Sequence, residues 1–199
     1  MRNYVVIAVI VVMAVLLSGN AMAESLKGKF GVNGRLGFII PADSDKNDPA
    51  GRLLVNTDAG ITGGGGFIYG LDDNLAVEMD VIHSSFDTNS AEWGTAEINT
   101  LSFTVQYRFP AQNRIIPYVG GGVDVLISDL PSHSIDTVLG LHLAAGADYF
   151  LTSQFALNAE LKGVEAFDAD VIDSNGGAKV GNFNPSSLTG TLGVRFFFN

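Results

Sequence analysis

The sequence contains no cysteine, few basic residues and, after its N-terminal region, no long apolar run. Without cysteine, no disulfide framework can stabilise an exported domain. Lys and Arg number 11 against 21 Asp and Glu, and the formal net charge is −10. This balance excludes the clustered basic surface that nucleic-acid binding requires. The missing apolar runs of about 20 residues exclude transmembrane helices from the rest of the chain.

The first 23 residues have the three parts of a secretory signal peptide. Arg2 is basic, residues 4–17 are apolar, and Ala21-Met22-Ala23 is a small-residue cleavage site. We therefore expect a signal peptide over 1–23 and a single domain over 24–199. The alternative is an uncleaved anchor helix, for which the apolar run is short.

Apolar and polar residues alternate along much of the chain. In EINTLSFTVQYRF, residues 97–109, the odd positions from Leu101 to Phe109 are apolar and the even positions from Thr100 to Arg108 are polar. A period of two predicts a strand with one apolar and one polar face. The same pattern recurs in seven further segments: 29–40, 55–71, 75–86, 115–128, 138–151, 155–163 and 186–198. The sequence therefore predicts eight strands.

The connectors between these segments alternate in length. Those at 72–74, 110–114 and 152–154 are short, whereas those at 41–54, 87–96, 129–137 and 164–185 are longer. Short turns at one end and long loops at the other are typical of outer-membrane barrels. An even number of strands closes such a barrel without a free edge. The predicted fold is all-β: an eight-stranded antiparallel up-and-down transmembrane β-barrel in a bacterial outer membrane. The alternative is a soluble, lipocalin-like barrel with the apolar face inside.

Aromatic residues gather near the short-turn end of the predicted strands. Interfacial aromatic girdles are a feature of membrane barrels. We expect a periplasmic girdle made of Phe30, Phe67, Tyr69, Tyr107, Phe109, Tyr149, Phe155, Phe196 and Phe198.

The polar faces carry charges of both signs. In a membrane barrel these faces line the lumen, where unpaired charges are costly. We expect a lumen network of Lys29, Arg35, Asp58, Glu78, Asp80, Arg108, Asp124, Asp148, Glu160, Lys162 and Arg195. One interpretation is a structural ion-paired core, and the other is a polar constriction or gate. Inward glycines such as Gly146 leave room either for a passage or for inward Tyr118 and Phe150.

Three segments carry a resemblance to a known group. IIPYVGGGVDVLI, GADYFLTSQFALNAELK and a final strand ending VRFFF are similar to the small eight-stranded outer-membrane proteins of the OmpW and opacity-protein group. The resemblance covers most of the mature chain and is strongest over 115–162. Such chains usually end on an aromatic residue, whereas here Asn199 follows Phe198.

The resemblance implies a non-enzymatic envelope protein surrounded by outer-membrane lipid and lipopolysaccharide. It also implies recognition of the C-terminal strand by the barrel assembly machinery. It further implies a route for small hydrophobic solutes that leave sideways into the membrane. Outward Gly63, Gly65 and Gly121 are candidate weak positions in the wall, although glycine also eases barrel curvature.

One group of three residues resembles the active site of an enzyme. IHSSF places His83 and Ser85 two residues apart, and Glu97 begins the next strand. Ser, His and a carboxylate form a hydrolase set, and the spacing resembles the PagL-type lipid A deacylases. In that reading Ser85 is the nucleophile, His83 the base and Glu97 the orienting residue. This sequence differs from those enzymes in two ways. Phe86-Asp87 follows the Ser where they have Asn-Ala, and the motif lies in the middle of the chain where theirs lies close to the C-terminus. The other interpretation is a set of polar residues at the outer interface.

The predicted long loops are acidic, as in DSDKND (43–48) and DADVID (168–173). Carboxylates in such spacing can bind divalent cations, but neither segment has the EF-hand pattern, and we expect solvated loops. An adhesin acting through these loops is a third functional alternative. His142 is expected to point inward alone, so the sequence predicts neither a metal site nor a cofactor.

Overall fold

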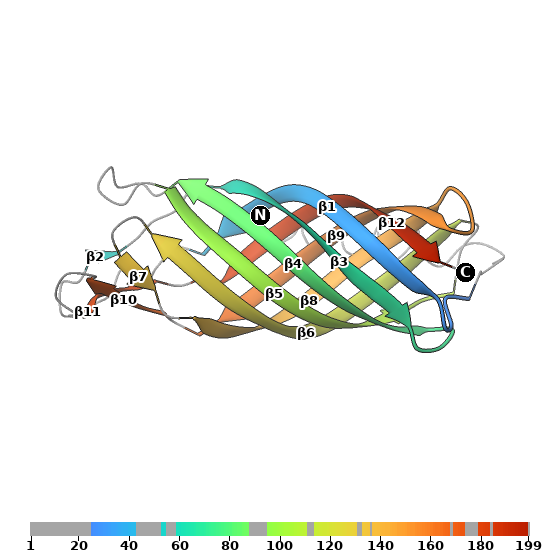
Figure 1. Ribbon diagram of the computed structural model, residues 1–199, viewed down its shortest axis with the longest axis horizontal. Helices are drawn as coiled ribbons and strands as arrows, with labels where there is room; N and C mark the ends of the chain where they lie inside the picture. The colour runs from blue at the N-terminus through green and yellow to red at the C-terminus, as the bar shows by residue number, and fades with distance from the viewer. Residues whose placement is uncertain are drawn as a thin grey trace, which may run out of the picture.

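A computed structural model describes residues 25–42, 53–54, 59–87, 95–110, 114–130, 133–135, 137–167, 169–173, 179–183 and 185–198. Eight long strands wind around a common axis (Figure 1). They are β1 (Phe30–Pro41), β3 (Gly60–Gly70), β4 (Leu75–Asp87), β5 (Thr95–Arg108), β6 (Ile115–Leu130), β8 (Val138–Phe150), β9 (Phe155–Ala166) and β12 (Ser187–Phe198). Each corresponds to one predicted segment, so the predicted eight-stranded barrel is confirmed. The predicted signal peptide lies outside the described residues.

The barrel closes because β12 pairs antiparallel with both β1 and β9. Following the paired residues once around the wall from Phe30 leads through Val105 and Leu143 to Ile40. The circuit thus returns to β1 ten residues further along. For eight strands, this stagger corresponds to a strand tilt of about 40°. The interior is then just wide enough to be filled by side chains.

Side-chain exposure alternates along the strands as the sequence predicts. In β9, outward Leu157 and Leu161 are exposed, whereas inward Asn158 and Glu160 are buried. The apolar face therefore meets lipid and the polar face fills the lumen. No helix among the described residues is long and apolar enough to cross a membrane.

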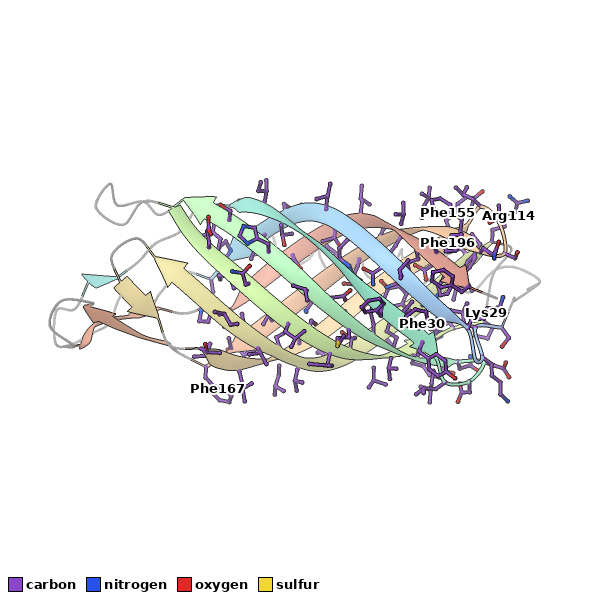
Figure 2. The ribbon with its side chains drawn as sticks, in the orientation of Figure 1. Lys29, Phe30, Arg114, Phe155, Phe167 and Phe196 are labelled. Atoms are coloured by element: carbon purple, nitrogen blue, oxygen red, sulfur yellow. The ribbon has the colours of Figure 1, made fainter. Side chains whose placement is uncertain are left out.

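Exposed aromatic side chains surround the short-turn end, where Phe30, Phe155 and Phe196 lie together at the right of Figure 2. Phe30 stacks on Phe67 and on Phe198, with ring centroids 5.6 and 5.9 Å apart. Tyr107 and Phe109 meet edge to face. The other predicted members, Tyr69, Tyr149 and Phe196, are exposed as well, and Phe155 is half-buried.

The short turns are closed by their own side chains. Asp72 accepts hydrogen bonds from the backbone N–H groups of Asn74 and Leu75, both at 2.7 Å. Thr152 accepts one from Phe155 at 3.0 Å. Local bonds of this kind explain why Asp and Thr stand at these tight turns.

The prediction that the long connectors carry only loops is wrong in part. They contain β2 (Leu53–Leu54), β7 (His133–Ile135), β10 (Ala169–Asp173) and β11 (Lys179–Phe183). These short strands join the wall through β6 and extend it beyond the barrel, at the left of Figure 1. The β2–β11 pair is parallel. Alternation did not predict these strands because they are only two to five residues long, and the β7–β10 and β2–β11 pairs join different connectors.

Candidate functional site

The barrel interior is the candidate site, because nine predicted lumen charges point into it. They come from seven of the long strands and are all at least nine-tenths buried. They are Arg35, Glu78, Asp80, Arg108, Asp124, Asp148, Glu160, Lys162 and Arg195. Asp58 lies outside the described residues. Lys29 is half-buried just before β1, at the short-turn rim.

Arg195 is the centre of the larger network and is fully buried. Its Nη1 donates to both carboxylate oxygens of Asp148, at 3.0 and 2.8 Å. Its Nη2 donates to Glu78 at 2.7 Å. Asp148 lies on β8 and Glu78 on β4, so this guanidinium joins two separated parts of the wall across the lumen.

Tyr118 fills the space beside Arg195. Its hydroxyl donates to Glu160 at 2.7 Å and accepts from Asn158 at 3.0 Å. The guanidinium carbons of Arg195 and Arg108 lie 5.0 and 5.5 Å from its ring centroid, which is the range of cation–π attraction.

Gly146, paired opposite Tyr118, provides the room for this ring. A Cβ on Gly146 would lie 2.5 Å from the Tyr118 hydroxyl oxygen. This inward glycine therefore accommodates a side chain, which was one of the two readings of the sequence.

Arg35 binds carboxylates on two other strands. Its guanidinium contacts Glu78, lies 3.2 Å from Asp80 and donates to Glu160 at 2.8 Å. Asn33 donates to both Glu78 and Asp80 at 2.9 Å. A planar guanidinium is suited to holding several carboxylates at once.

A second cluster lies further toward the long-loop end. Lys162 donates to Asp124 at 2.9 Å and to Ser102 at 2.7 Å. His142 Nδ1 is 3.0 Å from the other Asp124 oxygen, and its Nε2 is 3.0 Å from Thr104 Oγ1. The prediction that His142 stands alone is therefore wrong, because β6 supplies Asp124 and β5, one strand further along the wall, supplies Thr104. In the described part of the chain, no three His, Asp or Glu side chains are grouped as metal ligands.

Apolar side chains close the lumen at the short-turn end. This floor consists of Leu26, Ile68, Ala76, Ile116, Phe150, Ala156 and Phe197. Phe150 stacks on Phe197 at 5.7 Å. Leu26 reaches the floor because Gly28, with φ of 73°, turns the segment before β1 and donates to the Gly70 carbonyl at 2.8 Å. This positive φ favours glycine.

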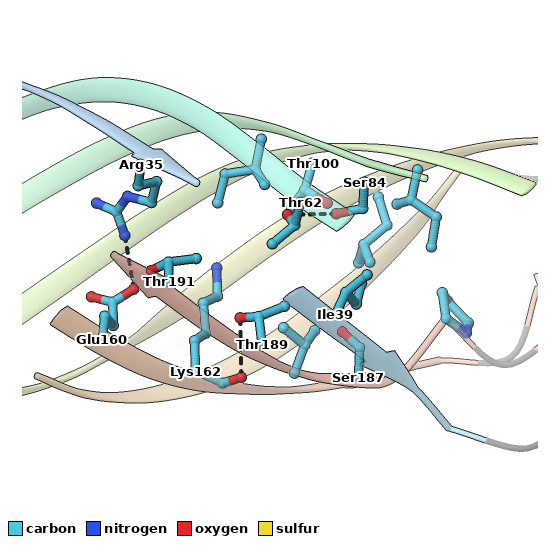
Figure 3. A pocket seen from close by; sticks show the side chains of 15 residues that line it. Arg35, Ile39, Thr62, Ser84, Thr100, Glu160, Lys162, Ser187, Thr189 and Thr191 are labelled. Atoms are coloured by element: carbon cyan, nitrogen blue, oxygen red, sulfur yellow. Dashed lines mark hydrogen bonds and ion pairs between the residues drawn. The ribbon is translucent and has the colours of Figure 1, made fainter. Parts of the chain in front are cut away.

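A small cavity lies in the long-loop half of the lumen (Figure 3). Arg35, Glu160 and Lys162 line it together with the hydroxyl groups of Thr62, Ser84, Thr100, Thr189 and Thr191. Five aliphatic side chains are interleaved with these hydroxyl groups and form an apolar collar around the cavity: Ile39, Ile82, Ile98, Leu126 and Val164. The cavity volume is about 30 Å³, which holds about two water molecules.

The wall beside this cavity is continuously paired in the described strands. Strands β1 and β12 stay in register from Phe30–Phe198 to Pro41–Ser187. Outward Gly63 is covered by Leu36, whose Cδ2 lies 2.5 Å from where a Cβ on Gly63 would be. A sideways exit therefore requires strands to separate.

Comparison with known proteins identifies the family of this barrel. The sequence matches the family model of the outer membrane protein beta-barrel domain over residues 9–196. The chain belongs to this family. Its location is the bacterial outer membrane, as predicted, with the lipid-facing surface in contact with the lipids of that membrane.

Three solved barrels have a similar fold. OprG from Pseudomonas aeruginosa has a TM-score of 0.69 and 17% identity, over 90% of this chain and 100% of that one. The outer membrane protein AlkL has a TM-score of 0.61 and 17% identity, over 92% of this chain and 95% of that one. Neisserial surface protein A has a TM-score of 0.59 and 16% identity, over 85% of this chain and 97% of that one. These likenesses confirm the small eight-stranded outer-membrane barrel. No curated protein matches the chain significantly.

The residues of the deacylase alternative lie on the lipid-facing wall. Ser85 pairs directly with Glu97, and His83 with Asn99. His83 Nδ1 is 2.9 Å from Asn99 Oδ1. A hydrolase relay requires the histidine between the serine and the carboxylate. Here the carboxylate pairs across from the serine, and the described ring contact of His83 is with an amide.

The sequence reasoning missed the apolar floor and collar. Their signal is a run of adjacent apolar residues where alternation breaks down near strand ends, such as Phe67-Ile68-Tyr69, Phe196-Phe197-Phe198 and Phe38-Ile39-Ile40. The middle residue of each run is buried inside the barrel: Ile68 and Phe197 belong to the floor, and Ile39 belongs to the collar.

Proposed function

We propose that this protein is a closed structural barrel that contributes to outer-membrane integrity. The observation that carries the proposal is the position of Arg195, which is fully buried at the centre of the lumen and bound to carboxylates on β4 and β8. A wide aqueous pore is incompatible with side chains joined across it.

Opening this interior would be energetically unfavourable. Separating Arg195 from Asp148 and Glu78 leaves a buried guanidinium uncompensated and removes one of two cationic partners from each carboxylate, at a cost of about 3–5 kcal/mol. The apolar floor adds a second barrier, because water and ions avoid a dry apolar layer. The described interior therefore supports a permanently closed resting state.

Planar-bilayer conductance tests this role. The wild-type protein should give no stable conductance steps. A variant that combines Tyr118→Ala, Arg195→Ala and Phe150→Ala should conduct, because it removes the central side chains and part of the floor. Arg114→Ala, in an exposed turn, is the matched control and should stay closed. Wild-type conductance equal to that of the triple variant would refute the closed barrel.

Passage of small hydrophobic solutes is the second candidate, and the apolar collar around the outer cavity favours it. A solute entering from the loop side would meet the aliphatic side chains and the hydroxyl groups together, before the charges of Arg35, Glu160 and Lys162. The continuous wall and the ion-paired layer both oppose onward movement, so strands of the wall would have to separate during passage.

Uptake of an apolar fluorescent probe by proteoliposomes tests passage. Ile39→Trp would fill the collar from inside and should lower uptake. Ile40→Trp, on the adjacent lipid-facing residue, should leave it unchanged. Equal uptake by both variants and the wild-type protein would remove this candidate.

For assembly, we propose that β12 is the strand that the barrel assembly machinery recognises. It closes the barrel on both sides, and its last residues place Phe196 and Phe198 outward and Phe197 inward. Phe198→Ala should lower the yield of inserted protein in cells. Phe109→Ala, at the same rim and directly after the end of β5, is the control.

A further inference from the structure

Four polar side chains form a patch on the lipid-facing wall, near the long-loop end of β4 and β5. This outer polar patch consists of His83, Ser85, Glu97 and Asn99. The antiparallel register pairs Ser85 with Glu97 and His83 with Asn99. His83 and Glu97 are exposed, and Ser85 and Asn99 are half-exposed. The resting barrel described above makes no use of this patch.

The patch spans the outer edge of the apolar band. With a tilt of about 40°, each residue advances about 2.5 Å along the barrel axis and each strand crossing adds about 3 Å. His83 then lies about 21 Å and Asn99 about 24 Å from the level of Phe30, followed by Ser85 at about 26 Å and Glu97 at about 29 Å. Lipid-facing Ile40 and Ile127 reach about 25 and 27 Å.

Aliphatic residues border the patch at Ser85 and Asn99, whereas Glu97 pairs with Asp129 on β6. Ile61, paired with Ser85, is 74% exposed, and Ile127, paired with Asn99, is 46% exposed. Gly63, paired with His83, adds no side chain. A molecule that contacts the patch therefore also contacts lipid-facing aliphatic side chains.

The patch has the chemistry for hydroxyl groups. An imidazole, an amide, a hydroxyl and a carboxylate together donate and accept hydrogen bonds. The four residues include no Lys or Arg, so they lack the fixed cations that phosphate recognition favours. Sugar hydroxyls satisfy such a mixed set.

We propose that the outer polar patch binds the sugar headgroup of an outer-leaflet glycolipid, whose acyl chains run toward the membrane centre over Ile61 and Val81, both exposed on the lipid-facing wall. The patch binds this lipid without cleaving it, because the Ser85–Glu97 and His83–Asn99 pairs do not form a hydrolase relay. The probe for the test is lipid A.

Native mass spectrometry of the full protein in nanodiscs tests the proposal. The nanodiscs contain phosphatidylethanolamine and phosphatidylglycerol with a small fraction of lipid A. The wild-type barrel should retain lipid A several-fold above its share of the bilayer. A His83→Leu/Asn99→Leu variant should retain it only at that share. These changes extend the apolar band, and heat-modifiable gel migration verifies the fold.

Glu165→Leu is the matched control, because Glu165 is another exposed polar residue on the lipid-facing side, on β9. It should retain lipid A like the wild-type protein. Monophosphoryl lipid A should bind as well as the bisphosphorylated form, because the sugar is recognised. Retention at the bulk share by the wild-type protein, equal loss in Glu165→Leu, or dependence on the second phosphate would overturn the proposal. A lipid A mass reduced by one acyl chain would replace binding with hydrolysis.

Discussion

Arg195 Nη1 lies 3.0 and 2.8 Å from the two carboxylate oxygens of Asp148, and both residues are fully buried. The pair joins β12 to β8, which are not adjacent in the wall. The contact therefore connects two strands that share no wall hydrogen bonds, because it passes over the intervening strand β9.

Arg195→Met should lower the free energy of unfolding by about 3–5 kcal/mol, because Asp148 and Glu78 each lose a buried cationic partner. Urea titration of the protein in lipid vesicles measures the change. Arg114→Met removes an exposed turn cation and should change stability little. A loss for Arg195→Met no larger than that of this control would contradict the role assigned to the pair.

Gly146→Ala should lower the free energy of unfolding by about 1–3 kcal/mol, because its Cβ would clash with Tyr118. The clash distances are 2.5 Å to the Tyr118 hydroxyl and 2.6 Å to the Ala159 carbonyl. Gly163→Ala is the control, since no heavy atom lies within 4 Å of its Cβ position. Equal midpoints in urea for the two variants would show that Tyr118 does not need this space.

Lys162→Met should also be destabilising, by about 3 kcal/mol, because it removes the ammonium group from Asp124. Asp124 would keep only His142 of its two basic partners. The double variant Lys162→Met/Asp124→Leu should recover much of this loss, because no buried carboxylate remains. A double-mutant cycle on unfolding free energies measures the coupling, and strictly additive losses would argue against it.

Lipid A from cells that produce the protein should have the same mass with the wild-type chain as with Ser85→Ala. The reason is geometric: Ser85 pairs with Glu97, and His83 contacts Asn99. Mass spectrometry of extracted lipid A is the measurement. Loss of an acyl chain that depends on Ser85 would make the protein a deacylase.

Local patterns predicted most of the barrel wall. Leu101, Phe103 and Val105 alternate with Ser102, Thr104 and Gln106, and the structure exposes the first set more than the second. The strand pattern repeats every two residues, so burial of one residue predicts that of its neighbours. The short strands β7 and β10 were not predictable in this way, because each depends on a partner from another connector.

The eight strands and their two faces could be predicted from the sequence alone, because these properties depend on neighbours within one strand. Which inward groups meet depends on the folded barrel. Arg195 and Glu78 are 117 residues apart, and only the ten-residue stagger of the closed wall brings them together. The same closure placed Phe150 against Phe197 as a floor and gave His142 its partners. These contacts depend on barrel diameter and register, which no single strand encodes.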